Sequence, residues 1–132
     1  MAVATPRDEP SVADLKARIA SARPSDRVHL CLQIAQKQID ETDKLYASGD
    51  VGTAQTDLND VVAYSELARD YSIQSHKSQK QTEIAVRSMT RKLTNLLHSL
   101  ATADQAPVKD AIGRLEKVRD DLLASMFKKG PQ

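Results

Sequence analysis

Apolar and small side chains recur at alternating steps of three and four residues across the long stretch from Val51 to Ala101. This stretch contains a single glycine, at its second position, and no proline. Because such spacing is typical of a heptad seam, we expect one continuous helix over residues 51–101. The seam consists of Leu58, Val61, Ser65, Ala68, Ser72, Ser75, Gln79, Thr82, Val86, Met89, Leu93, Leu96 and Leu100.

The middle of this seam differs from its ends. Both ends are aliphatic, whereas Ser72, Ser75, Gln79 and Thr82 are small and polar. The unbroken heptad step predicts that the helix is continuous through residues 75–80. The same positions should be its least protected part, because these side chains bury little apolar area.

Shorter patterns predict three further helices. Ser11 and Asp14 resemble a capping box, followed by apolar residues at helical spacing, which predicts a helix over residues 11–22. Pro24 ends this segment and suits the first turn of a helix over residues 25–47. Pro107 similarly suits the start of a last helix over residues 107–128, before Gly130 and Pro131.

The turns between these segments predict how the helices pair. Gly49 stands where a left-handed C-cap is needed, and Asp50 can cap the helix that follows. Short turns make sequential helices antiparallel neighbours. We therefore expect an all-α, coiled-coil-like antiparallel bundle of four helices, with the second and fourth packed on the two halves of a long central third helix. The predicted domains are a flexible lead over residues 1–10, one helical domain over residues 11–129 and a tail over residues 130–132.

Composition narrows the classes of function. The 132 residues carry a formal net charge of +1 and include no Trp, one Phe and three Tyr. Aromatic platforms for stacking bases or sugars are therefore scarce. No run approaches the roughly 18 apolar residues of a membrane span, and the single Cys31 permits no intramolecular disulfide.

Candidate catalytic groups are few. His29 and Cys31 are two residues apart on a predicted helix and point to different sides, so we expect Cys31 to be a buried structural thiol. Asp26 and His29 form a charge pair more readily than a metal site, and no zinc-binding or phosphate-loop motif is present. The pair of Asp57 and Asp60 is interpreted as part of a solvated helix face. We expect no enzyme activity, no cofactor and no metal.

One charged face stands above this background. Lys77, Lys80, Arg87 and Arg91 share a side of the long predicted helix. Residues 77–101 hold five basic side chains against one acidic, a net of +4, whereas residues 40–70 hold eight acidic against two basic, a net of −6. The simplest interpretation is a solvated face, partly offset by pairing of Glu83 with Arg87. Binding of nucleic acid or another polyanion is the competing interpretation.

The bipolar charge also predicts self-association as an antiparallel homodimer with its axis near residues 75–79, where opposite charges would meet. The alternative is a helix that breaks near His76 and folds back into a monomeric bundle. Either arrangement would cover apolar residues outside the seams, which are Leu30, Ile34, Val62, Ile73, Ile84, Leu97, Leu123 and Phe127.

Several segments resemble a family of uncharacterised exported helical proteins of soil bacteria. The segments are residues 45–54 (LYASGDVGTA), 80–87 (KQTEIAVR), 104–112 (DQAPVKDAI) and 119–127 (RDDLLASMF), and the similarity covers about residues 12–128. It implies an extracytoplasmic, periplasmic or secreted location and supplies no mechanism. The start, residues 1–6, lacks the basic and apolar regions of an export signal, so a cytoplasmic location stays open. We therefore expect a non-enzymatic interaction or scaffold module that binds a protein partner or itself.

Overall fold

The computed structural model describes residues 10–128, which fold entirely into helices and connecting turns. The all-α prediction is confirmed. The elements are α1 (Val12–Ile19), α2 (Pro24–Ser48), α3 (Val51–Ser75), α4 (Gln79–His98), a short 3₁₀ turn η1 (Thr102–Asp104) and α5 (Gln105–Phe127).

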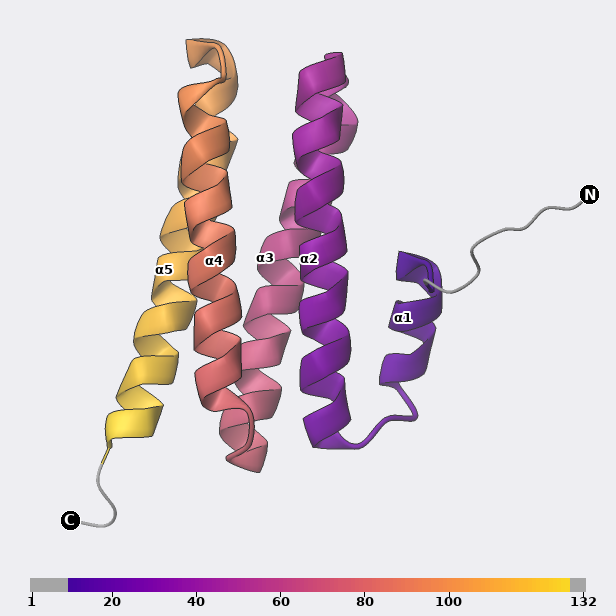
Figure 1. The fold of residues 1–132 in the computed structure, drawn as a ribbon, viewed down its shortest axis with the longest axis vertical. Helices are drawn as coiled ribbons and strands as arrows, with labels where there is room; N and C mark the ends of the chain where they lie inside the picture. Colours follow the sequence, from indigo (N-terminus) through magenta and orange to yellow (C-terminus); the bar gives the residue numbers. More distant parts are fainter. Residues whose placement is uncertain (1–9, 129–132) are drawn as a thin grey trace, which may run out of the picture.

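The continuous central helix is the main error of the sequence prediction. Helix α3 ends at Ser75, and α4 begins at Gln79 and runs back alongside it (Figure 1). His76 and Ser78 both adopt the left-handed conformation, with φ angles of 56° and 62°. Residues 10–128 therefore contain five α-helices rather than the four predicted, and residues 51–101 form a helical hairpin.

The polar middle of the seam explains why this break is tolerated. A continuous helix would gain little there, because Ser72, Ser75 and Gln79 offer little apolar surface to a neighbour. Folding back instead lets the α4–α5 hairpin pack against the α2–α3 hairpin. Val62, which lies outside the predicted seams, is buried in the core cluster that includes residues of both hairpins.

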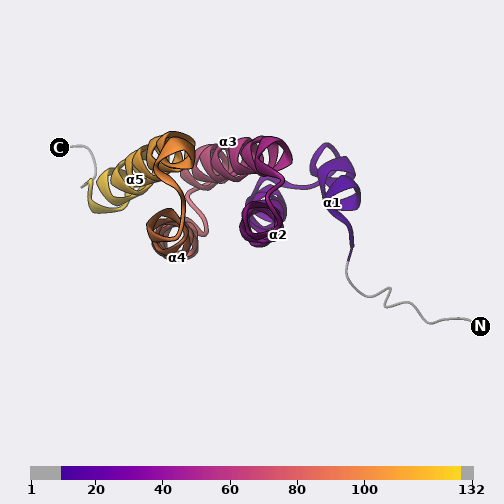
Figure 2. The same cartoon turned by 90° about the horizontal axis from the view of Figure 1, so that it is seen from above.

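The helices form two layers. Seen from above, α3 and α5 lie side by side in one layer, α2 and α4 lie in the other, and α1 flanks α2 at one edge (Figure 2). Within this arrangement α2 pairs with α3, and α5 pairs with α4. The predicted partners are therefore correct, although the two halves of the third segment are separate helices.

The predicted caps explain the remaining helix ends. Ser11 and Asp14 form a complete capping box at the start of α1. Gly49 has a φ angle of 87° after α2, and Asp50 accepts a hydrogen bond from the Thr53 backbone N–H at the start of α3. Helix α1 ends at Ile19, earlier than predicted, and Arg27 donates hydrogen bonds to the Ile19 and Ala20 carbonyls there.

The core is aliphatic and follows the predicted seams. Leu58, Val86, Leu93 and Leu115 are among its buried members. Of the residues predicted to need further cover, Ile34 and Val62 are buried, Leu30, Ile73, Leu97 and Leu123 are partly buried, and Ile84 and Phe127 are exposed. Within this single chain residues 76–78 form a turn, so α3 and α4 are not the unbroken helix on which the predicted antiparallel dimer was based, and the break near His76 is the alternative that the sequence also left open.

Two parts of the domain prediction lie at the chain ends. The predicted lead, apart from Pro10, and the predicted tail over residues 130–132 fall outside the described residues, as does residue 129 of the predicted domain. Within residues 10–128, no helix has the length and apolar character needed to cross a membrane.

Candidate functional site

The outward face of α4 carries most of the candidate residues. With about 100° per residue, Lys80, Ile84, Arg87 and Arg91 lie within about 60° of one another around the helix. All four are exposed, whereas Val86, Met89 and Leu93 on the opposite side are buried. We call Lys80, Ile84, Arg87 and Arg91 the α4 outer face. Lys77, the fourth predicted cation, lies in the turn before α4 and is also exposed.

Ile84 is the unusual member of this face. It retains 48% of its accessible surface and is one of only three large hydrophobic residues that are exposed among residues 10–128. Lys80 lies one helical turn before Ile84, and Arg87 one turn after it. Ile84 was predicted to need cover as an apolar residue outside the seams, but its place among the cations was not predicted.

Glu83 joins the α4 outer face to α5. Its carboxylate accepts hydrogen bonds from Arg87 Nη2 at 2.6 Å and from Arg119 Nε at 2.9 Å, although Glu83 itself is only 3% exposed. The hydrogen bond from Arg87, with a further one from Arg119, lowers the pKa of Glu83 against the opposing effect of burial. The pairing of Glu83 with Arg87 was predicted, but the contribution of Arg119 could not be read from a single helix.

The other cations are available to a partner. No ion pair involves Lys77, Lys80 or Arg91 among the described residues. Of the three cations on the α4 outer face, Arg87 alone forms an ion pair within the fold, and Lys80 and Arg91 form none among the described residues.

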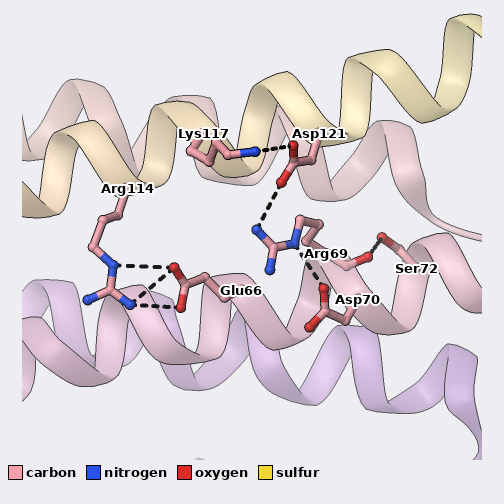
Figure 3. A network of polar contacts seen from close by, with 7 residues as sticks. All are labelled: Glu66, Arg69, Asp70, Ser72, Arg114, Lys117 and Asp121. Atoms are coloured by element: carbon pink, nitrogen blue, oxygen red, sulfur yellow. Dashed lines mark hydrogen bonds and ion pairs between the residues drawn. The ribbon is translucent and has the colours of Figure 1, made fainter.

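The acidic residues of α3 are used differently. Glu66 accepts hydrogen bonds from Arg114 of α5, the shortest at 2.9 Å, and Asp121 of α5 lies 3.1 Å from Arg69 of α3 (Figure 3). Lys92 of α4 also reaches Asp40 of α2 at 3.6 Å. Asp40 and Lys92 thus join the acidic and basic regions within one chain, whereas these regions were expected to meet between two copies. The ion pairs of α3 with α5 lie outside that prediction, because Arg114 and Asp121 follow the basic region.

Asp57 and Asp60 form a more structured site than predicted. Asp60 accepts hydrogen bonds from Lys16 Nζ at 3.1 Å and from Gln38 Nε2 at 3.0 Å, which link α1, α2 and α3. Burial raises the pKa of Asp57, and the nearby Glu41 and Asp60 carboxylates add to that increase. The pair is therefore half-buried and structural rather than a fully solvated face.

Cys31 is a buried thiol, as predicted. It is fully buried in the core, and this burial raises its pKa to about 11. His29 is exposed on another side of α2, so the two do not form a nucleophile and base pair. No ion pair joins Asp26 to His29 among the described side chains.

A groove that the sequence did not predict lies between α2 and α4. It has a volume of about 370 Å³. Ile39, Leu93 and Leu96 contribute its apolar lining, and Asp40, Asp43 and Lys92 its charged lining. The groove forms because α4 folds back beside α2. An unbroken third helix would not bring these two helices together.

Comparisons with protein-family models, with curated proteins and with solved structures find no match to this chain. In the part of the chain that the structure describes, no three His, Cys, Asp or Glu side chains are grouped so that they could hold a metal ion. The α4 outer face combines an exposed aliphatic side chain with cations, on a helix that Glu83 links to Arg119 of α5.

Proposed function

We propose that this protein is a non-catalytic helical interaction module that binds a partner protein through the α4 outer face. The observation that carries the proposal is the exposed Ile84 between Lys80 and Arg87. An apolar anchor surrounded by polar groups is the usual composition of a protein-binding patch.

The charges on this face define the partner. Lys80 and Arg91 have no acidic partners among the described residues, so a binding protein that supplies carboxylates would pair with them. An amphipathic helix with one aliphatic stripe and flanking Asp or Glu has the matching chemistry. Glu83 and Arg119 hold the helix in place, which limits the ordering that binding would require.

A designed acidic amphipathic peptide of Leu and Glu tests this function. Titration of the isotope-labelled protein should shift backbone resonances along residues 80–91. Ile84→Ser should weaken binding about tenfold or more, because it removes the anchor. Leu67→Ser is the matched control, since Leu67 is a 36% exposed aliphatic residue on α3 and should leave binding unchanged. Equal losses in both variants, or shifts elsewhere, would reject the α4 outer face as the binding site.

The second candidate function is binding of nucleic acid or another polyanion. It is favoured by Lys77, Lys80 and Arg91, whose charges are not neutralised by ion pairs within residues 10–128. Binding to a short DNA duplex should then weaken steeply with salt, and Lys80→Gln with Arg91→Gln should reduce that dependence. Ile84→Ser should have little effect on DNA binding, so this variant separates the two functions.

The proposal includes an extracytoplasmic location, which is supported by the resemblance to exported helical proteins. A fusion of the complete gene, with its own start, to a reporter that is active only outside the cytoplasm tests this location. Reporter activity would support export, and activity restricted to a cytoplasmic reporter would contradict it.

A further inference from the structure

The turn between α3 and α4 joins two helices whose seam residues keep the same spacing in the sequence. His76, Lys77 and Ser78 separate them, and neither glycine nor proline occurs in this turn. The seam positions on either side, Ser72 and Thr82, are both buried, and the sequence steps between them, through Ser75 and Gln79, alternate between three and four. The sequence is therefore compatible with a helix that continues through the turn.

The closed turn contains unfavourable features. His76 and Ser78 adopt positive φ angles that residues with a Cβ atom rarely occupy. The buried side-chain oxygen of Gln79, at the start of α4, has no hydrogen-bond partner among the described residues. Each of the two φ strains would disappear if residues 76–78 became helical.

The contacts between the α2–α3 hairpin and the α4–α5 hairpin could form equally well between two chains. The α2–α3 and α4–α5 hairpins meet through ion pairs such as Glu66 with Arg114 and Arg69 with Asp121 (Figure 3). Only the turn connects the hairpins covalently. A second copy could therefore supply the same α4–α5 surface, provided that residues 76–78 straighten.

We propose that the surface of α2 and α3 that receives α4 and α5 also binds these helices from a second copy, which gives a domain-swapped dimer. In this dimer residues 76–78 are helical and join α3 to α4 in each chain. The contacts between hairpins are conserved, while the strain in the turn is relieved, and association is favoured by high concentration. This dimer does not use the α4 outer face, so it is independent of the proposed function.

Two charge-reversed variants test the exchange. In Glu66→Arg the closed monomer places two arginines together, and in Arg114→Glu it places two glutamates together. A swapped heterodimer of these two variants restores an opposite-charge pair at both positions. After unfolding, mixing and refolding at high concentration, native mass spectrometry should find about three quarters or more of the dimers as heterodimers, against one half for random pairing.

In a matched control the fraction of heterodimers should fall below that of random pairing. The double variant Glu66→Arg with Arg114→Glu restores the pair within one chain, and its swapped heterodimer with the unmodified protein has like charges at both positions. This heterodimer should fall below half of the dimers formed. Random pairing in both mixtures, or only the monomer mass of 14.5 kDa at every concentration, would overturn the proposal.

The turn itself provides a second test. His76→Ala with Ser78→Ala favours the helical state of residues 76–78 and should increase the dimer association constant about tenfold or more. His76→Gly with Ser78→Gly favours the closed turn and disfavours a helix, so it should decrease the constant by a similar factor. Sedimentation equilibrium measures both changes, and shifts in the opposite directions would contradict the proposed hinge.

Discussion

The turns that follow α2 and α3 use the same hydrogen-bond pattern with different residues. After α2, the N–H groups of Gly49 and Asp50 bond to the carbonyls of Tyr46 and Leu45 at 3.1 and 2.9 Å. After α3, the N–H groups of His76 and Lys77 bond to those of Ile73 and Ser72 at 3.3 and 3.2 Å. Both are Schellman caps with a left-handed residue.

The residues around these caps make the two turns unequal. Gly49 occupies its left-handed position without a Cβ atom, whereas His76 must hold a side chain there. Asp50 then caps α3 with its carboxylate, whereas Ser78 precedes α4 in a left-handed conformation and makes no side-chain cap. The first turn is therefore specified locally, and the second is maintained by the packing of the hairpins on either side.

Among the variants that compare the two turns, Glu83→Ala should cause the largest loss in the free energy of unfolding. Glu83 anchors α4, which has no side-chain N-cap, to Arg119 of α5. Its loss should reduce the free energy of unfolding by about 2 kcal/mol, less than for a fully buried ion pair because both arginines are partly exposed. Urea unfolding measures the change. The matched variant Glu116→Ala removes an exposed glutamate of α5 and should leave stability nearly unchanged.

The Glu83 carboxylate should also make the stability of the protein depend on pH. Because the pKa of Glu83 is lowered in the folded state, its contribution is complete above the unfolded value of about 4.3 and is lost as the pH falls through the folded value. Stability of the unmodified protein should therefore fall more steeply below about pH 4.5 than that of Glu83→Ala. Parallel pH profiles would show that Glu83 does not supply this stability.

Most of the fold could be predicted because its signals are local. Single residues specify several helix ends by their own chemistry: Gly49 ends α2, Asp50 caps α3, and the capping box at Ser11 starts α1. The break at His76 has no glycine, proline or side-chain cap of this kind, and the contacts of α3 with α5 that accompany it join residues far apart in sequence. Periodicity alone cannot distinguish a long helix from two helices in register.

The candidate site also has one part that the sequence could predict and another that it could not. Lys80, Arg87 and Arg91 could be grouped from helical spacing, and the structure leaves all three exposed. The link from Glu83 to Arg119 and the groove between α2 and α4 depend on which helices become neighbours. Both therefore required the tertiary arrangement.

Gly49→Ala tests the well-formed turn. The φ angle of 87° is unfavourable for alanine, and an added Cβ atom would meet nothing within 4 Å, so the expected cost of about 1 kcal/mol comes from the backbone alone. Thermal and urea unfolding measure it. Gly113→Ala is the control, because Gly113 lies inside α5 with equally open space around it and should gain stability from helix propensity. A gain in stability for Gly49→Ala would refute the assigned role.

His76→Gly tests the turn between α3 and α4, where the expected change in stability has the opposite sign. Glycine relieves the left-handed strain, and the greater freedom of the unfolded chain offsets part of that gain. We expect a net increase of about 0.5 kcal/mol in the unfolding free energy of the monomer, measured by urea unfolding at low concentration. A decrease would mean that the imidazole makes contacts that stabilise the closed turn.

The smallest predicted effects compare the residues that precede α3 and α4. Asp50→Ala removes a carboxylate that accepts from the Thr53 N–H at 3.4 Å, a long hydrogen bond, so the expected loss is about 0.5 kcal/mol, at the low end for N-caps. Ser78→Ala should change stability by less than about 0.3 kcal/mol, because the Ser78 side chain makes no capping hydrogen bond. Amide exchange of the first turn resolves effects of this size: protection should fall in α3 for the first variant and stay constant in α4 for the second. Equal losses in both helices would show that the two turns are capped alike and that the break at His76 is specified as firmly as the one at Gly49.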